Sequence, residues 1–264
     1  MLRAGALVFE KRRGPLRAAV LPPFVPYATP LLDAPLRETD THHRRSALDA
    51  LLTLLATEFD QTSLVLHPSL DDGRAFQWAG WQVEPAYTYR LDIHDQESAT
   101  AGWSSTPKHT FRSKAEDYSV REGADAIADA VALVEASHER QDHALGVPLG
   151  AVQTLASRLV EAGLLRVFVA RREGVGEAAV FVLSDGRTAH YWIAGSAPGP
   201  AMTVLVGRLL DRLRDDGVAY FDFVGANVPT IAEFKRKFGS TLVPYLRARH
   251  VAHPALRLLD RLRR

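Results

Sequence analysis

The chain has 264 residues, of which 47% are hydrophobic and 24% are charged, and its formal net charge is +1. This composition predicts a globular protein with a sizeable core, and the balanced charge gives no reason to expect DNA as a partner. The sequence contains no cysteine, which excludes a disulfide scaffold, a thiolate nucleophile and a zinc site built on sulfur. No apolar run approaches the roughly 18 residues of a bilayer span, so we expect a cytoplasmic protein without stable membrane insertion.

The first part of the chain predicts mixed α and β structure. Two short strands are expected around the turn at Arg13 and Gly14. Leucines recur at helical spacing from about Arg44 to Phe59, which predicts an amphipathic helix lying on a sheet. Two further strands are expected in the segments SLVLHPSL and YTYRLDI, separated by the aromatic stretch FQWAGWQVEPAY.

Small and polar residues around Gly102 and Pro107 indicate a junction between two halves. Three helices should follow, at about Pro107 to Asp117, Gly123 to Arg140 and Pro148 to Gly163. The runs LLRVFVARR, EAAVFVLSD and RTAHYWIAG read as three strands of an antiparallel meander, because Asp185 and Gly186 form a hairpin signal between the last two.

The remaining elements alternate between helix and strand. A helix is expected from about Ala201 to Asp216, then the strand VAYFDFVG, then a short helix from about Pro229 to Phe238 whose proline suits the first turn. The strand TLVPYLRARH and the basic amphipathic helix PALRLLDRLRR complete the chain.

The segment YFDFVGANVPTIAEFKRKFGSTLVPY, Tyr220 to Tyr245, resembles the C-terminal signature of Fem-like aminoacyltransferases and their acetyltransferase-like relatives in the GNAT superfamily. It has a strand ending in Asp-Phe and a glycine, followed by Phe-Lys-x-x-Phe-Gly. The segments HPSLDDGRAFQWAGWQVEPAYTYRLDI and TFRSKAEDYSV resemble the middle of these proteins, the second as a basic helix and its following strand.

This resemblance covers nearly the whole chain and implies an α+β fold of two tandem GNAT-like halves, with mixed, mostly antiparallel sheets flanked by helices. We expect the N-terminal half at residues 1–103 and the C-terminal acyltransferase half at residues 104–264. Family members usually begin with an additional strand and helix, so the N-terminal half is expected to be shortened. The long helical arm of the cell-wall Fem enzymes does not occur in this sequence.

The resemblance also implies an activity, the transfer of an acyl or aminoacyl group to an amine. The donor would be acyl-CoA or an aminoacyl-tRNA acting as co-substrate, with no tightly bound cofactor, and tRNA would then be a partner. The acceptor would be a small molecule or a cell-envelope precursor. The sequence leaves the oligomeric state open.

Two residues are predicted to be catalytic. Lys235 occupies the Phe-Lys position whose lysine, in the resembling enzymes, stabilises charge in the transition state; the alternative is a solvated lysine, since at least one of Lys235, Arg236 and Lys237 must face solvent. Asp222 lies between two phenylalanines in a strand, so its side chain should project away from theirs and toward the site. The alternative for Asp222 is a cap on a turn or helix.

Acyl transfer needs a polarised carbonyl, a stabilised oxyanion and a proton acceptor. In a GNAT-like core a strand offers backbone N–H groups to the carbonyl and the next helix N-terminus receives a phosphate. Here these would be the strand AHYWIAG and the loop SAPGP, whose two prolines donate no N–H and depart from the usual CoA loop. The predicted donor-binding residues are Tyr191, Ile193, Gly195, Ser196 and Gly199.

Arginine forks and aromatic rings suit a polar acceptor. The predicted acceptor-binding residues are Arg74, Trp78, Tyr87, Lys108, Arg112 and Phe234. Their alternative roles are core packing for the aromatic side chains and surface charge for the basic ones. No metal is expected, because the histidines have no second ligand pair at zinc-like spacing.

A serine hydrolase, a Walker A nucleotidase and a dinucleotide-binding enzyme are excluded, since none of their glycine-containing motifs occurs. Two other classes remain open. One is a catalytically silent GNAT-like ligand-binding module, favoured by the unusual loop and the shortened start. The other, an RNA-binding protein, would need a basic face that this nearly neutral chain does not suggest.

Overall fold

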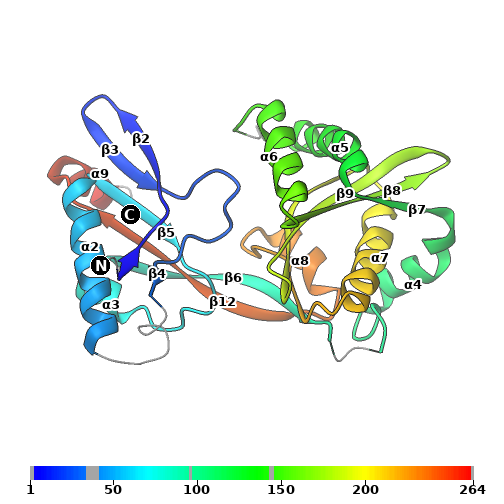
Figure 1. Ribbon diagram of the computed structural model, residues 1–264, viewed down its shortest axis with the longest axis horizontal. Coiled ribbons are helices and arrows are strands. Elements are labelled where there is room, and N and C mark those ends of the chain that lie inside the picture. Colours follow the sequence, from blue (N-terminus) through cyan, green and yellow to red (C-terminus); the bar gives the residue numbers. More distant parts are fainter. Residues whose placement is uncertain (1–2, 34–41, 95–96, 143–145, 263–264) are drawn as a thin grey trace. The chain divides into compact units, whose positions relative to one another are not determined.

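The computed structural model describes residues 3–33, 42–94, 97–142 and 146–262 (Figure 1). The chain forms two compact units, unit 1 with Met1–Tyr87 and Pro244–Arg264, and unit 2 with Thr88–Val243. This grouping differs from the halves expected at residues 1–103 and 104–264, because the C-terminal strand pairs with a strand of the first part of the chain. The boundary at residue 103 between two family halves stays a prediction.

Unit 1 contains a four-stranded sheet segment in the order β2-β3-β5-β12. Strands β2 and β3 form the predicted hairpin, β5 runs parallel to β3, and β12 runs antiparallel to β5. A separate antiparallel pair joins β1 to β4. The elements are β1 (Ala4–Gly5), β2 (Phe9–Arg13), β3 (Leu16–Val20), β4 (Leu31–Leu32), α2 (His42–Glu58), β5 (Gln61–Val65), α3 (Arg74–Trp78), the start of β6 (Gln82–Asp92), β12 (Thr241–Val251) and α9 (Pro254–Leu262).

The core of unit 1 lies beneath α2. Leucines on one side of this helix are buried, as their 3.6-residue spacing predicts, and they pack against Leu64 and Leu66 of the β5 region. Phe76 and Trp81 close the cluster with an edge-to-face contact at 5.7 Å between ring centroids. The predicted helix over Arg44 to Phe59 is therefore confirmed, with bounds shifted by one or two residues.

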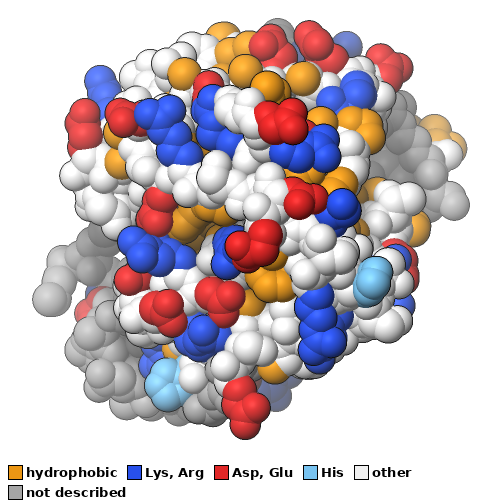
Figure 2. Space-filling view, turned by 90° about the vertical axis from the view of Figure 1, so that its right-hand side faces the viewer, with side chains coloured by type: hydrophobic (Ala, Val, Ile, Leu, Met, Phe, Trp, Pro, Cys, Tyr) orange, Lys and Arg blue, Asp and Glu red, His pale blue; other side chains and the backbone are white. Residues whose placement is uncertain are grey.

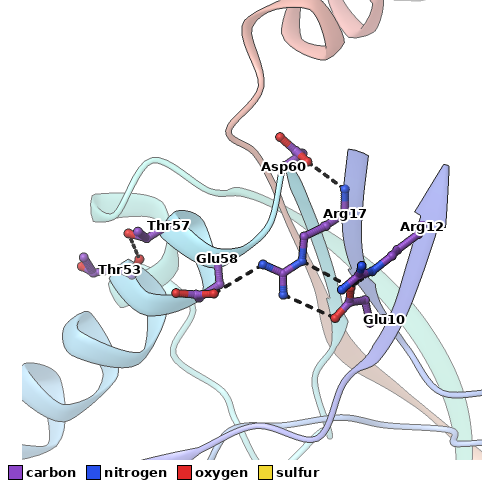
Figure 3. Close-up of polar contacts among 7 residues, drawn as sticks. All are labelled: Glu10, Arg12, Arg17, Thr53, Thr57, Glu58 and Asp60. Atoms are coloured by element: carbon purple, nitrogen blue, oxygen red, sulfur yellow. Dashed lines mark hydrogen bonds and ion pairs between the residues drawn. The ribbon is translucent and has the colours of Figure 1, made fainter. Parts of the chain in front are cut away.

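Hydrogen bonds and ion pairs connect the β2–β3 hairpin with the end of α2 and the residues that follow it (Figure 3). The backbone N–H of Arg17 donates to Asp60 Oδ2 at 2.7 Å, and the Arg17 guanidinium bridges Glu10 and Glu58 at 3.2 and 3.5 Å. Arg12 also donates to Glu10, at 2.5 Å. The ion pairs of Glu10 with Arg12 and Arg17 and of Arg17 with Glu58 are solvent-accessible, so each adds little to stability.

Unit 2 is built on a sheet segment in the order β6-β11-β10-β9-β8-β7. The predicted antiparallel meander is confirmed in β8, β9 and β10. The remaining pairings are antiparallel except for β10 with β11, which is parallel. The strands are β7 (Ser119–Glu122), β8 (Leu165–Arg172), β9 (Val175–Ser184), β10 (Thr188–Ser196) and β11 (Tyr220–Asp222).

Helices cover both faces of this sheet segment. Figure 1 shows α5 and α6 on one side of β8 and β9 and α7 on the other. Successive residues of β8 face opposite sides of the sheet and contact these two layers in turn. Phe168 belongs to the core cluster beneath α7, whereas Val169 lies near Leu133 of α5. The helices are α4 (Ser105–Lys114), α5 (Ile127–Arg140), α6 (Leu149–Glu161), α7 (Ala201–Asp215) and α8 (Pro229–Arg236), with 3-10 turns at Ala115–Asp117 and Ala124–Ala126.

One predicted strand is much shorter than its sequence suggests. The run VAYFDFVG has Asp222 as its one charged residue, yet only Tyr220–Asp222 form β11. The chain turns directly afterwards, because Asp222 Oδ1 accepts the backbone N–H of Val224 at 2.8 Å and Val224 has a φ of 50°. The hydrogen bond from the Val224 backbone to the Asp222 side chain replaces a strand hydrogen bond, so β11 ends although apolar residues follow.

Two further features bear on partners. Within the described ranges, no helix combines the length and apolarity needed to cross a bilayer. On the face of the molecule drawn in Figure 2, Lys and Arg side chains are interspersed with Asp and Glu, so this face offers no basic patch suited to RNA.

Candidate active site

The centre of the candidate site in unit 2 is the place where β10 and β11 separate. The two strands pair only at Thr188, Ala189 and His190, and β10 then continues to Ser196 with β9 as its partner. In an antiparallel pair, every second residue directs its N–H and C=O away from the partner strand. Beyond His190, every second residue of β10 therefore directs its N–H and C=O away from β9. These groups point to the side where β11 no longer pairs with β10.

A β-bulge at Trp192 marks the same place, because Tyr191 pairs with Val182 and Ile193 with the adjacent Phe181. The bulge reverses the alternation of side chains. Tyr191 packs against the core cluster beneath α7, whereas a Cβ on Gly195 would lie 2.5 Å from backbone atoms of α5. Simple alternation would place residues 191 and 195 on one face, and the bulge puts them on opposite faces.

The predicted donor-binding residues accordingly have different surroundings. Gly195 permits close packing on α5, and Ile193 is buried. The Ser196 carbonyl accepts a hydrogen bond from Arg140 at the end of α5. Gly199 has a φ of 137° in the loop before α7, and Pro200 is the N-cap of that helix. Donor binding by these residues stays a prediction, but Arg140 adds a cation to the loop that the sequence did not reveal.

Lys235 is 6% exposed and lies within α8. Its Nζ donates to the carbonyl oxygens of Phe223, Val224 and Gly225 at 2.6, 2.8 and 2.8 Å. An ammonium has three N–H donors, so these carbonyls engage all of them. Lys235 is thus not a solvated lysine, and in this conformation it holds the turn after β11; direct donation to a substrate would require it to release one carbonyl.

Burial lowers the pKa of Lys235 to about 8, and the carboxylate of Asp222 partly offsets this effect. The amine therefore remains mostly protonated at neutral pH. Its Nζ lies 5.6 Å from the ring centroid of Tyr191, whose hydroxyl contacts Met202 Sδ at 3.2 Å. The ammonium is therefore held by carbonyl dipoles on one side and an aromatic ring on the other.

Asp222 is 2% exposed and forms the second part of the site. Its Oδ1 accepts the Thr88 hydroxyl at 2.6 Å as well as the N–H of Val224, and the Thr88 oxygen accepts the N–H of Gly225 at 3.1 Å. The carboxylate does project away from Phe221 and Phe223, as alternation predicts, but it also caps the turn. The structure thus fits both sequence interpretations of Asp222, a side chain that projects away from its phenylalanine neighbours and a cap on a turn. Its catalytic role stays a prediction.

His190 is the site residue that sequence reasoning missed. Its Nδ1 lies 3.8 Å from Asp222 Oδ2, because the parallel register of β10 and β11 sets the two residues side by side. Burial lowers the pKa of His190, so its imidazole is neutral at pH 7. A signal was present, since His190 and Asp222 are polar residues within otherwise apolar strand segments, but the pairing of their strands could not be read from the sequence.

The predicted acceptor residues fall into two groups. Arg74, Trp78 and Tyr87 are exposed residues of unit 1. In unit 2, Lys108 is half-buried and Arg112 is exposed on α4, and Phe234 makes an edge contact with Phe238 at 4.9 Å. A shared acceptor cleft stays a prediction. Across the residues that the structure describes, no group of three or more His, Asp or Glu side chains is arranged to hold a metal ion.

These features define a class of protein. A three-stranded antiparallel meander, a bulge in its last strand, a helix, and a parallel strand that separates from the bulged strand are the arrangement of a GNAT fold. Residues 108–236 match the family described as "Acetyltransferase (GNAT) domain". This segment of the chain is therefore a GNAT acetyltransferase domain.

Solved structures extend the likeness to almost the whole chain. FemX matches with a TM-score of 0.67 at 11% identity, over 97% of this chain and 90% of that one. The C-terminal domain of a putative lysylphosphatidylglycerol synthetase from Agrobacterium fabrum matches with a TM-score of 0.65 at 15% identity, over 97% and 85%. A tandem GNAT protein from the clavulanic acid biosynthesis pathway gives 0.54 at 16%, over 90% and 79%.

At these identities the comparisons establish the fold. They confirm the tandem GNAT α+β architecture and the resemblance to Fem-like GNAT proteins that the sequence indicated. No protein of curated function matches the chain in sequence.

Proposed function

We propose that this protein is an N-acyltransferase that moves an acyl group from a thioester such as acyl-CoA to an amine. The observation that carries the proposal is the early end of pairing between β10 and β11, at His190. A donor carbonyl placed beside β10 would meet backbone N–H groups there, as oxyanion stabilisation requires. The loop before α7, with Arg140 beside Ser196, would receive the donor phosphates.

In the proposed reaction the acceptor nitrogen attacks the acyl carbonyl carbon, and the carbon–sulfur bond breaks when the tetrahedral intermediate collapses. Neutral His190 takes the proton released by the amine, and Asp222 stabilises the resulting imidazolium at 3.8 Å. The departing thiolate is protonated by solvent. No covalent enzyme intermediate is needed. Lys235 acts as a positioning residue that fixes the turn next to Asp222.

The test combines donor binding with turnover. Thermal stabilisation should be measured with acetyl-CoA, longer acyl-CoAs and a charged tRNA, because a ligand that binds the folded state raises the melting temperature. Thiol release should then be followed with a panel of amines. We expect His190→Gln to bind donor normally and to lose turnover, whereas His109→Gln, which changes an exposed histidine of α4, should keep both.

A rise in melting temperature with charged tRNA alone would indicate that the donor is an aminoacyl-tRNA. Absence of both binding and transfer with every donor would overturn the proposal.

A second candidate is a silent GNAT-like binding module. The specific observation in its favour is that all three N–H donors of Lys235 are engaged by backbone carbonyls. The two prolines of the loop before α7 also remove N–H groups that would bind phosphate. This candidate predicts a thermal shift with a ligand and no acyl transfer with any amine, so the same two measurements separate it from the enzyme.

A further inference from the structure

Unit 1 contains an open pocket of about 310 Å³ between the first turns of α2 and the short helix α3. Leu48 and Ala75 form its apolar part. The remaining side chains are polar or aromatic: His42, Arg44, Arg45, Asp72, Arg74 and Trp78. All of these lining residues belong to unit 1.

The charge of this lining is strongly positive. Three arginines face one aspartate, which leaves a formal charge of 3 − 1 = +2 with histidine neutral. No acidic residue occupies the first turn of α2 to compensate. Arg44 is half-buried, and its positive charge is one of the causes that lower the pKa of Asp72. Gathering like charges in one pocket costs free energy, which an anionic ligand would recover.

Two of the three guanidinium groups are paired with carboxylates. Arg74 forms a two-point contact with Asp72, through Nε to Oδ1 at 2.9 Å and Nη2 to Oδ2 at 2.7 Å. These hydrogen bonds, with the Arg74 backbone N–H, lower the pKa of Asp72 to about 2, so the contact persists over the physiological range. Arg45 pairs with Asp49, outside the pocket, at 3.6 Å.

Trp78 joins the two elements of the pocket. The guanidinium carbon of Arg45 lies 4.3 Å from its ring centroid and that of Arg74 lies 5.5 Å away, so both arginines are set over the indole. Trp78 is nevertheless 58% exposed. An exposed indole beside fixed guanidinium groups offers an apolar surface next to an anion site, which suits a ligand whose anionic group is attached to an organic body.

We propose that this pocket binds the phosphate or pyrophosphate group of a small molecule. Guanidinium groups match phosphate oxygens with paired N–H donors, and a doubly charged phosphate balances the net charge of the lining. A single carboxylate would balance only half of it. The phosphate belongs either to a nucleotide-linked precursor or to a lipid headgroup, and the chemistry of the pocket is the same for both.

This inference deepens the proposed function and rests on it in one respect, that the bound phosphate belongs to the amine acceptor. Binding itself requires no turnover. If acyl transfer is not observed, the proposal of phosphate binding in the pocket still stands. If phosphate binding is not observed, the proposal of proton transfer by His190 still stands.

The test is isothermal titration calorimetry of the full chain with inorganic pyrophosphate. We expect saturable 1:1 binding that Arg44→Gln weakens at least 10-fold, because this arginine contributes charge without holding another side chain. The matched control is Arg12→Gln, an exposed arginine of the same unit outside the pocket, which should bind as the unchanged protein does. Unchanged melting temperatures would show that both variants fold.

Two further arms identify the source of the phosphate. Tighter binding of a uridine diphosphate sugar than of pyrophosphate supports a nucleotide-linked precursor. Arg44-dependent binding to vesicles of phosphatidylglycerol mixed with phosphatidylcholine, but not to phosphatidylcholine alone, supports a lipid headgroup. Absence of saturable binding, equal affinity in Arg44→Gln and the unchanged protein, or stronger binding of acetate than of pyrophosphate would each overturn the proposal.

Discussion

Thr88 donates its hydroxyl hydrogen to Asp222 Oδ1 over 2.6 Å, although 134 residues separate the two in the chain. The same hydroxyl oxygen accepts the N–H of Gly225, so one small side chain of β6 connects the end of β11 with the turn that follows it. Lys235 binds the carbonyls of that turn from the other direction. The separation of β10 and β11 thus lies beside a turn held by two buried side chains.

Replacing Thr88 with valine should destabilise the protein by about 1–3 kcal/mol, because the isosteric change leaves a buried carboxylate oxygen and the Gly225 N–H with fewer partners. Chemical denaturation measures this difference. Thr57→Val is the control, since the Thr57 hydroxyl bonds only its own helix and is exposed (Figure 3), and it should change stability by less than about 0.5 kcal/mol. Equal effects of the two variants would contradict the role assigned to Thr88.

Replacing Lys235 with methionine should cost about 2–4 kcal/mol, because three carbonyl oxygens lose their donor. Lys237→Met is the control, since Lys237 is only partly buried and pairs with the exposed Glu233 at 3.7 Å. Should the two variants unfold at the same denaturant concentration, Lys235 would not be the clamp described here.

The pH dependence of this difference has a definite sign. The pKa of Lys235 is about 8 in the folded protein and near 10.5 in the unfolded chain. Between these values the unfolded state binds more protons, so folding stability attributable to Lys235 rises with pH across this range, by up to about 3 kcal/mol. The stability of the unchanged protein minus that of Lys235→Met should therefore grow from pH 8 to 10; a flat difference would show that the lysine titrates normally.

Replacing Gly195 with alanine should destabilise the protein by about 1–3 kcal/mol, because the new methyl group would meet the backbone of Leu133 and Val134 at 2.5 Å. Gly150→Ala is the control, as this glycine lies in α6 with open space around it and should gain up to about 1 kcal/mol. Thermal unfolding compares them. A Gly195→Ala protein of normal stability that no longer binds donor would instead assign Gly195 to the donor site.

Replacing His190 with glutamine should lower kcat/KM about 10²–10⁴-fold, the usual range for a lost general base. Burial sets the pKa of His190 below its ordinary value, so activity should fall only when the pH drops below the usual histidine range. Measuring rate against pH in both proteins tests this, since the variant should lose the acidic limb. An unchanged limb in His190→Gln would assign the proton transfer to another group.

Much of the local structure could be predicted from residue patterns. Leucines at 3.6-residue spacing located α2, and the Asp185-Gly186 signal between two apolar runs located the β9–β10 hairpin. The Phe-Lys motif pointed to Lys235, which the structure places at the centre of the turn after β11. The predictions of α2 and of the hairpin were correct because each depends on residues close together in the chain, whereas a catalytic role for Lys235 stays a prediction.

Other predictions failed, or could not be made, where distant residues decide the outcome. Simple alternation along β10 would put Tyr191 and Gly195 on one face of the sheet, but the bulge in its pairing with β9 separates them, and no local pattern reveals that bulge. The length of β11 was overestimated, because the Asp222 carboxylate turns the chain at a point where apolar residues continue. His190 was overlooked, since only the parallel register brings it to Asp222.

The order of elements, the GNAT-like class and the residue types available for acyl transfer follow from the amino-acid sequence alone, because periodicity and short motifs are local properties of the chain. Which of these residues contact one another depends on how the elements pack in the fold. Thr88 with Asp222, His190 with Asp222, and the arginines of α2 with Trp78 are pairs that strand register and helix packing create. Burial then lowers the pKa of His190 and of Lys235, since the cost of desolvating an ion depends on everything that surrounds it.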